Sequence, residues 1–234
     1  MIKTVILCGG RGTRLGARTE EIPKPLVEIG GKPILWHIMK IYSHYGLNNF
    51  VLCLGYKGDM IKTYFQNSSE FNIEFVDTGL ETGTAGRLYK VKDYLDKQFC
   101  MTYGDGLSDV SIKELLNFHN KNSGIMTVTA IRPLVRFGLL DIEGTQVKRF
   151  SKNSVPVHGW IDGGFFVVNK DIFKYLENSD EAEMLEGRIL DELSIDSNLF
   201  AFKHRGYWKC IDTPRDLENI EEDILMKRDF WRIW

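Results

Sequence analysis

The chain has 234 residues, of which 43% are hydrophobic and 26% are charged, and its formal net charge is −2. This balance is typical of a globular domain with a large core, and it argues against a disordered chain and against the basic surface of a nucleic-acid-binding protein. The N-terminal apolar run is too short for a signal peptide, and no stretch of about 18 apolar residues predicts a membrane span. We therefore expect a cytoplasmic protein that binds neither nucleic acid nor a membrane.

The four cysteines do not form a metal or disulfide pattern. No two of them make a CxxC pair, and the five histidines do not cluster near them, which argues against a zinc site. Three of the four lie in apolar runs, as buried free thiols do in a reducing compartment.

Short apolar runs alternate with segments of helical periodicity along the first 131 residues. The predicted strands are residues 3–8, 49–55, 72–78, 98–105 and 125–131. The predicted helices are residues 33–46, 57–65, 85–95 and 111–121. This alternation predicts an α/β fold, a Rossmann-like, mainly parallel twisted sheet with helices on both faces. Ligands bind such sheets beyond the carboxyl ends of the strands, so the loops after residues 3–8 and 98–103 are expected at the functional edge.

The second part of the chain changes character. Residues 136–168 hold short strands and turns, which predict a small added β region that returns to the main sheet. Helices near 170–178 and 184–195, a strand at 199–204 and a helix from about Pro214 complete the pattern. No linker or repeat divides the chain, so we predict a single domain, 1–234, with a nucleotide-binding half (1–131) and an acceptor-binding half (132–234).

The strongest local signal follows the first predicted strand and consists of Leu7, Gly9, Gly10, Arg11, Gly12, Thr13 and Arg14. Glycines let backbone N–H groups approach a polyphosphate, and arginines add charge-assisted hydrogen bonds. A plain glycine-rich turn is the alternative, which the alternating arginines disfavour. A Rossmann fingerprint needs a glycine where Leu15 stands, and no Walker A string occurs, so neither hydride transfer nor P-loop chemistry is favoured.

Two further segments have phosphate-binding features. Lys24 lies between Pro23 and Pro25, which preset an extended backbone around the ammonium, although a surface lysine is the plain alternative. Thr82 and Gly83 precede a predicted helix whose free N–H groups and positive dipole end favour an anion. An ordinary helix cap is the alternative there.

On these motifs the chain resembles the sugar-phosphate nucleotidyltransferase family. The strings GGRGTRL and PKPLVEIGGKP carry the general resemblance, whereas WHIMKIYSHYG, TYGDG, GGFFV and KCIDTPRDLE resemble glucose-1-phosphate cytidylyltransferases, over roughly residues 1–220. The resemblance implies a GT-A-like nucleotidyltransferase that joins CTP to a sugar 1-phosphate, most simply glucose 1-phosphate, and releases pyrophosphate for nucleotide-sugar and polysaccharide biosynthesis. It implies Mg²⁺ as cofactor, and we expect a homo-oligomer.

The resemblance also implies residue roles. Arg14 and Lys24 would act in catalysis, and Asp105 and Asp212 would hold Mg²⁺. On the residues alone, the first aspartate is equally a turn residue and the second is a helix cap. The implied nucleotide-binding residues are Leu7, Gly9, Gly10, Arg11, Gly12, Thr13, Thr82, Gly83, Arg87 and Gly104. An acceptor phosphate oxygen would attack the α-phosphorus in line, so no protein nucleophile is required.

Two departures from the family pattern fall in the acceptor-binding half. A Glu-Lys-Pro stretch of the family corresponds to Ser151, Lys152 and Asn153, and a family asparagine corresponds to Asp162. We expect Lys152, Asp162 and Gly163 to bind the acceptor, although an aspartate adds a negative charge and removes a donor.

Three alternatives stay open. The acceptor could be a different phosphorylated metabolite, and the triphosphate could be UTP, GTP or dTTP. A non-catalytic nucleotide-sugar-binding subunit is less favoured, because the chain keeps Arg14, Lys24, Asp105 and Asp212.

Overall fold

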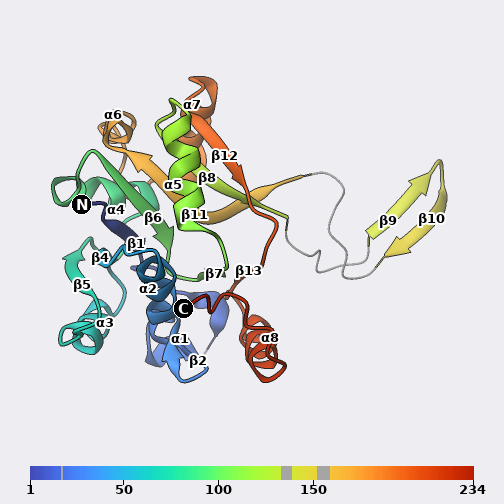
Figure 1. The fold of residues 1–234 in the computed structure, drawn as a ribbon, viewed down its shortest axis with the longest axis horizontal. Helices are drawn as coiled ribbons and strands as arrows, with labels where there is room; N and C mark the ends of the chain where they lie inside the picture. Colours follow the sequence, from blue (N-terminus) through green and yellow to red (C-terminus); the bar gives the residue numbers. More distant parts are fainter. Residues whose placement is uncertain (17, 133–138, 152–158) are drawn as a thin grey trace.

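A seven-stranded sheet forms the centre of the molecule, with strand order β12-β8-β11-β6-β1-β4-β5 (Figure 1). The computed structural model describes residues 1–16, 18–132, 139–151 and 159–234. All neighbouring strands of the sheet are parallel except β11, which runs antiparallel to both β6 and β8. This confirms the predicted mainly parallel sheet. Its strands are β1 Thr4–Leu7, β4 Asn49–Leu54, β5 Asn72–Asp77, β6 Gln98–Tyr103, β8 Met126–Ile131, β11 Ile161–Asn169 and β12 Leu199–Lys203.

Helices cover both faces of this sheet, as the alternating pattern predicts. Because successive strand residues point to opposite faces, Val5 and Ile6 of β1 belong to two different buried apolar clusters. The helices are α1 Arg18–Glu21, α2 Ile34–His44, α3 Gly58–Phe65, α4 Thr84–Lys90, α5 Ile112–Lys121, α6 Phe173–Leu176, α7 Leu190–Ile195 and α8 Pro214–Leu225. Shorter helical turns are Thr13–Leu15, Lys24–Leu26, Lys92–Tyr94, Lys170–Ile172 and the π-helical turn Leu185–Ile189. No helix in the described part is long and apolar enough to cross a membrane.

Two strands of three residues each, β7 (Gly106–Ser108) and β13 (Trp208–Cys210), pair antiparallel beside the main sheet. The sequence did not predict them, because three residues are too short to show periodicity. Ile211 N donates to Asp105 O at 3.0 Å. This hydrogen bond extends the pairing by one residue, to Asp105 before β7 and Ile211 after β13. The pairing thus brings two distant parts of the chain to one edge of the sheet.

Helix α8 begins with a capping box, which fixes the end of the loop after β13. The Thr213 side chain accepts from Asp216 N, and the Asp216 carboxylate accepts from Thr213 N. Pro214 occupies the first turn, where a missing N–H costs nothing. Asp212 N also donates to the Asp216 carboxylate at 3.1 Å, so the cap holds the residue that precedes it.

The predicted β region consists of a separate hairpin and the return strand β11. The hairpin, β9 (Leu139–Glu143) and β10 (Gln146–Ser151), stands apart from the main sheet in Figure 1. Its exposed apolar side chains face one another across the two strands in the pairs Leu140–Phe150 and Ile142–Val147. The remaining short strands, β2 (Glu28–Ile29) and β3 (Lys32–Pro33), pair with each other.

Candidate active site

An open pocket of about 1420 Å³ lies at the carboxyl ends of β1 and β6, beside β13 and the start of β11. This is the edge at which a mainly parallel sheet binds its ligands. Of the predicted site residues, those that line the pocket are Leu7, Gly10, Gly12, Arg14, Lys24, Gly104, Asp105, Asp162, Gly163 and Asp212. The predicted functional edge therefore coincides with the pocket.

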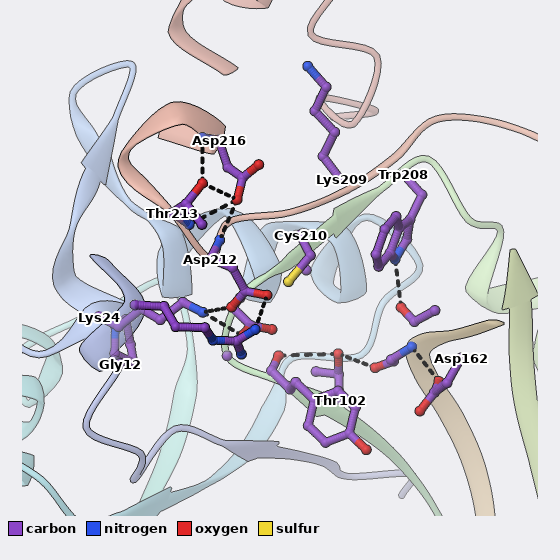
Figure 2. A pocket seen from close by; sticks show the side chains of 18 of the residues that line it. Gly12, Lys24, Thr102, Asp162, Trp208, Lys209, Cys210, Asp212, Thr213 and Asp216 are labelled. Atoms are coloured by element: carbon purple, nitrogen blue, oxygen red, sulfur yellow. Dashed lines mark hydrogen bonds and ion pairs between the residues drawn. The ribbon is translucent and has the colours of Figure 1, made fainter. Parts of the chain in front are cut away.

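A cluster of opposite charges occupies the centre of the pocket (Figure 2). Lys24 Nζ lies 2.7 Å from Asp105 Oδ2 and 2.7 Å from Asp212 Oδ1. Arg14 Nη1 lies 3.0 Å from Asp212 Oδ2. Burial alone would lower the pKa of Lys24, which is only 8% exposed, but the two carboxylates outweigh burial and raise it. The ammonium is therefore charged, and the two ion pairs immobilise it. The extended backbone predicted from the flanking prolines was wrong at Lys24, which lies in the 3-10 turn Lys24–Leu26 and follows an extended Pro23.

Gly12 makes room for this lysine. Its φ of 64° lies in the left-handed region, and a Cβ there would meet Lys24 Cβ at 2.8 Å. The glycine-rich loop thus has a packing role against Lys24 in addition to the phosphate-binding role predicted for it.

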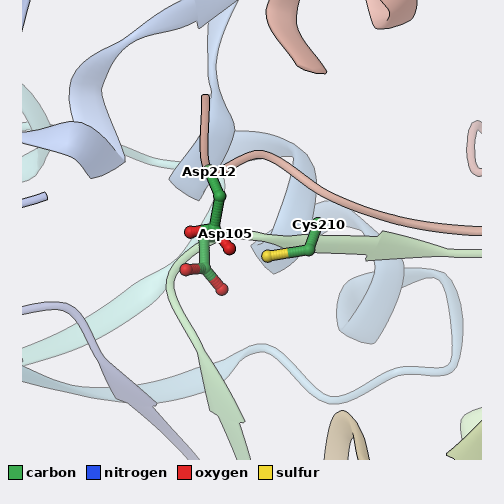
Figure 3. Close-up of side chains that lie close together, drawn as sticks. All are labelled: Asp105, Cys210 and Asp212. Carbon is green, nitrogen blue, oxygen red and sulfur yellow. The ribbon is translucent and has the colours of Figure 1, made fainter. Parts of the chain in front are cut away.

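Asp105, Asp212 and Cys210 form a candidate cation site (Figure 3). One ligand atom from each lies within 4.8 Å of the others. Burial, and then the charge of Asp105, raise the pKa of the Cys210 thiol, so this group is a poor ligand for a hard cation. The carboxylates already hold one cation between them, the Lys24 ammonium. Two such oxygen donors suit a hard divalent ion.

The N-terminus of α4 is already capped, contrary to the prediction of free N–H groups there. Gly83 N donates to Glu181 O at 2.9 Å, and Ala85 N donates to Glu183 O at 3.1 Å. Thr82 Oγ1 donates to Thr78 O at 2.5 Å. Neither Thr82 nor Gly83 is among the residues that line the pocket. Two of the N–H groups expected to be free, those of Gly83 and Ala85, are therefore already used, and nucleotide binding by Thr82 and Gly83 stays a prediction.

Arg87 is also placed differently from the expected phosphate contact. Arg87 is 4% exposed, and its guanidinium donates to Leu54 O, Thr78 Oγ1, Gly79 O, Gly9 O and Leu80 O at 2.6–3.3 Å. Leu54 ends β4, and the other four acceptors lie in the loops after β1 and β5. Arg87 therefore ties these two loops to the end of β4, and it is absent from the pocket lining.

Three other residues of the glycine-rich loop lie outside the pocket lining. A Cβ on Gly9 would meet Arg87 Nη1 at 2.1 Å, so this glycine is needed for packing. Arg11 pairs with Glu81 at 2.7 Å on the surface, and Thr13 does not line the pocket. Lys152 falls outside the described residues.

The acceptor side of the pocket carries Asp162 at the start of β11. Asp162 Oδ1 accepts from Gly164 N at 2.7 Å, and Trp208 Nε1 donates to Gly163 O at 2.7 Å (Figure 2). Burial raises the pKa of Asp162 to about 6, and the charge of Glu186 adds to the shift. The Tyr103 hydroxyl donates to Glu186 Oε1.

Sequence reasoning missed Glu186, Tyr103 and Trp208. They come from three separate segments. The only signal in the sequence is that Tyr103 and Trp208 are aromatic residues close to the predicted Asp105 and Asp212, and nothing marks Glu186.

A cationic cluster surrounds Trp160 next to the acceptor side. Arg132 Cζ lies 4.3 Å, Lys203 Nζ 5.6 Å and Arg205 Cζ 5.7 Å from the indole centroids. None of the three cations pairs with a carboxylate among residues 1–16, 18–132, 139–151 and 159–234. Arg132 and Lys203 follow or end β8 and β12, so the cluster lies at the functional edge.

The comparisons with known proteins agree with this geometry. A family model described as "Nucleotidyl transferase" matches residues 3–227. The chain belongs to the nucleotidyl transferase family. It is 40% identical to the "Glucose-1-phosphate cytidylyltransferase" of Salmonella typhi and 41% identical to the "Probable glucose-1-phosphate cytidylyltransferase" of Bacillus subtilis (strain 168), with 100% of each chain covered.

Solved structures share the architecture of this nucleotidyltransferase. Two structures of HddC from Yersinia pseudotuberculosis match at 24% identity. The TM-score is 0.72 for the structure complexed with GMP-PN and 0.74 for the other. Each match covers 96% of this chain and 100% of the other. This likeness shows a common fold.

Proposed function

We propose that this nucleotidyltransferase transfers the cytidylyl group of CTP to glucose 1-phosphate and forms CDP-glucose and pyrophosphate. The observation that carries the proposal is Lys24, held between Asp105 and Asp212 at 2.7 Å from each in the pocket. The full-length similarity to proteins named glucose-1-phosphate cytidylyltransferases supports CTP and glucose 1-phosphate as the substrates.

The proposed chemistry needs charge neutralisation more than a protein nucleophile. A sugar phosphate is largely dianionic near neutral pH and can attack the α-phosphorus of CTP in line. Lys24 would bind the α-phosphate or the attacking phosphate, and Arg14 with the glycine-rich loop would bind the leaving pyrophosphate. Both cations are bound to Asp212 in the structure, so each must exchange a carboxylate for a phosphate when substrate binds.

Asp105 and Asp212 fit a magnesium ion, and we propose them as its ligands. Bound Mg²⁺ would supply charge neutralisation at the phosphate oxygens. Their separate origins, a turn after β6 and the residue before the α8 cap, fix the spacing of the two carboxylates before any ligand arrives.

The acceptor phosphate is proposed to approach the pocket from the cationic cluster around Trp160. Arg132, Lys203 and Arg205 concentrate positive charge there without a carboxylate partner in the described segments. A positive region of this kind attracts an anionic substrate. Asp162 and Gly163 follow Trp160 closely in sequence, line the pocket and would contact the acceptor.

The protein is proposed to work as a homo-oligomer. The exposed apolar face of the β9–β10 hairpin supports this, because two strands alone are marginally stable in water and gain from a covering surface. A second copy of the chain is the proposed cover, and light scattering after size exclusion measures the number of copies.

A pyrophosphate-release assay tests the proposed reaction. The purified protein is incubated with Mg²⁺, each of CTP, UTP, GTP and dTTP, and a panel of sugar 1-phosphates. CTP with glucose 1-phosphate is expected to give the highest kcat/KM, because a site built for one pyrimidine edge leaves polar groups unpaired with another. Equal kcat/KM for CTP and UTP would contradict the nucleotide assignment. If CTP releases no pyrophosphate with any hexose 1-phosphate, the acceptor assignment is contradicted. If none of the four triphosphates releases pyrophosphate with any acceptor, a binding subunit is favoured.

A further inference from the structure

Glu186 projects into the acceptor side of the pocket from the π-helical turn Leu185–Ile189. Its backbone angles, φ −76° and ψ 32°, depart from helical values, so the turn is kinked at this residue. No catalytic role described above uses the Glu186 carboxylate.

Two hydroxyl groups orient this carboxylate. Tyr103 OH donates to Glu186 Oε1, and Thr84 Oγ1 donates to Glu186 Oε2 at 2.9 Å. Tyr103 ends β6 two residues before Asp105, and Thr84 opens α4. A carboxylate offers about four acceptor positions, so two protein donors leave about two of them for a ligand. The side chain is exposed, yet it is held in one orientation.

The segment that carries Glu186 is anchored by close packing. A Cβ on Gly83 would meet Glu183 O at 2.1 Å, and one on Gly86 would meet Glu181 O at 2.4 Å. Both glycines belong to α4 or its cap. The tight contact and the backbone hydrogen bonds to Gly83 and Ala85 fix the approach of the turn to the pocket.

Glu186 and Asp162 act on each other electrostatically, and neither has a cation partner in the described part of the chain. Both line the pocket together with Ile161 and Met184, which are 48% and 50% exposed. Acceptor-only groups beside exposed apolar side chains suit a ligand that presents O–H donors and C–H surface. A sugar ring has both.

We propose that Glu186 is an acceptor-recognition residue that accepts hydrogen bonds from ring hydroxyls of the sugar 1-phosphate, on the side of the pocket that Asp162 also lines. This inference rests on the proposed function and names the part of the acceptor that the site reads. The cationic cluster around Trp160 attracts the phosphate, and Glu186 selects a hydroxylated ring.

The test is a double-mutant cycle in which one change is made in the enzyme and the other in the substrate. Wild-type protein and Glu186→Gln are assayed for pyrophosphate release with CTP and with glucose 1-phosphate or each monodeoxy analogue of it. Glu186→Gln is expected to raise the KM for glucose 1-phosphate by about ten-fold or more, as loss of a charged hydrogen bond does, while the KM for CTP stays within about two-fold. One deoxy analogue is expected to bind wild-type protein about ten-fold more weakly than glucose 1-phosphate, and Glu186→Gln is expected to lose this discrimination.

Glu183→Gln is the matched control. Glu183 lies on the same segment but pairs with Arg188 and does not line the pocket, so its substitution should leave both KM values unchanged. Turnover by the wild-type protein with an unchanged KM in Glu186→Gln, or the same discrimination among analogues in both proteins, would overturn the role of Glu186. Failure of the proposed function has a different signature, because wild-type protein would then release no pyrophosphate from CTP and glucose 1-phosphate.

Discussion

The two sides of the pocket differ in how their charges are compensated. On the nucleotide side, every charged group discussed above has an internal partner: Lys24 and Arg14 contact carboxylates, and Arg87 donates to five oxygens. On the acceptor side, Asp162 and Glu186 lack a cation and the cluster around Trp160 lacks a carboxylate, within the residues that the structure describes. The charged groups of the nucleotide side are thus compensated within the protein, whereas those of the acceptor side have no oppositely charged partner among the described residues.

This difference bears on what each substrate must do. A triphosphate bound by Arg14 and Lys24, as proposed, would displace existing ion pairs, so its binding on the nucleotide side would be an exchange of partners. An acceptor would meet carboxylates that have hydrogen-bond donors but no cation partner in the described residues, so it adds interactions without breaking an ion pair. Substitutions on the nucleotide side should therefore alter catalysis or stability, and those on the acceptor side should alter the KM for the acceptor.

The largest expected effect comes from the two carboxylates that hold Lys24. Asp105→Asn or Asp212→Asn should lower turnover on the order of 100-fold or more, because each removes a charge that acts in the transition state. Initial rates of pyrophosphate release with Mg²⁺ measure this. Glu81→Gln, which neutralises a surface partner of Arg11, is the control and should turn over normally. A near-normal rate in either asparagine variant would remove that residue from the site.

Arg87 provides the next test, because its two possible roles predict different outcomes. Arg87→Met should lower the free energy of unfolding by about 2 kcal/mol, since five oxygen acceptors at the ends of β1, β4 and β5 lose their donor. Urea unfolding measures it, with exposed Arg11→Met expected to change stability little. Unchanged stability together with a raised KM for CTP would instead restore the phosphate-binding role that the sequence implied.

The contrast between the two sides also explains what the sequence could predict. On the nucleotide side, periodicity predicted β1 and β6, and the family resemblance singled out Lys24 and Asp105, both of which line the pocket. The acceptor side is assembled from β6, β8, β11, β12 and the turn at 185–189. Glu186 and Trp160 reach it through tertiary packing, which leaves no local pattern in the sequence.

Arg87 shows the opposite limit. Its place at the start of a helix after Thr82 and Gly83 is typical of an anion site, yet the segment at 181–185 caps that helix end. A contact between residues about 100 positions apart in sequence decides whether backbone N–H groups are free. Local sequence cannot report such a contact, so the helix was predicted correctly, whereas nucleotide binding at its start stays a prediction.

The cationic cluster should give a smaller effect, confined to the acceptor. Arg205→Gln is expected to raise the KM for glucose 1-phosphate by about ten-fold and to weaken the dependence of that KM on salt, because one of three cations near Trp160 is lost. Lys113→Gln, on the exposed surface of α5, is the charge-matched control. An equal rise in the KM for CTP would show that the cluster does not belong to the acceptor side.

The smallest expected effect concerns Asp162 and pH. Burial raises its pKa to about 6 in the folded protein, above the ordinary value of 3.8. Ionisation therefore costs folding free energy: the stabilising contribution is fully present below the unfolded pKa and is lost as the pH rises through about 6. Asp162→Asn has no such proton, so the stability difference between wild type and variant should shift by about 1 kcal/mol in favour of the variant from pH 4 to pH 8, after allowance for partial solvent screening. Urea unfolding of both proteins at the two pH values measures this, and other titrating groups cancel in the comparison.

With glucose 1-phosphate as acceptor, the Asp162→Asn variant should keep its turnover, because the asparagine oxygen still accepts from a hydroxyl and the repulsion between Asp162 and the acceptor phosphate is gone. A pH-independent stability difference would show that folding does not raise the pKa of Asp162, and a strong rise in the KM would mean that it pairs with a cationic group of a different acceptor.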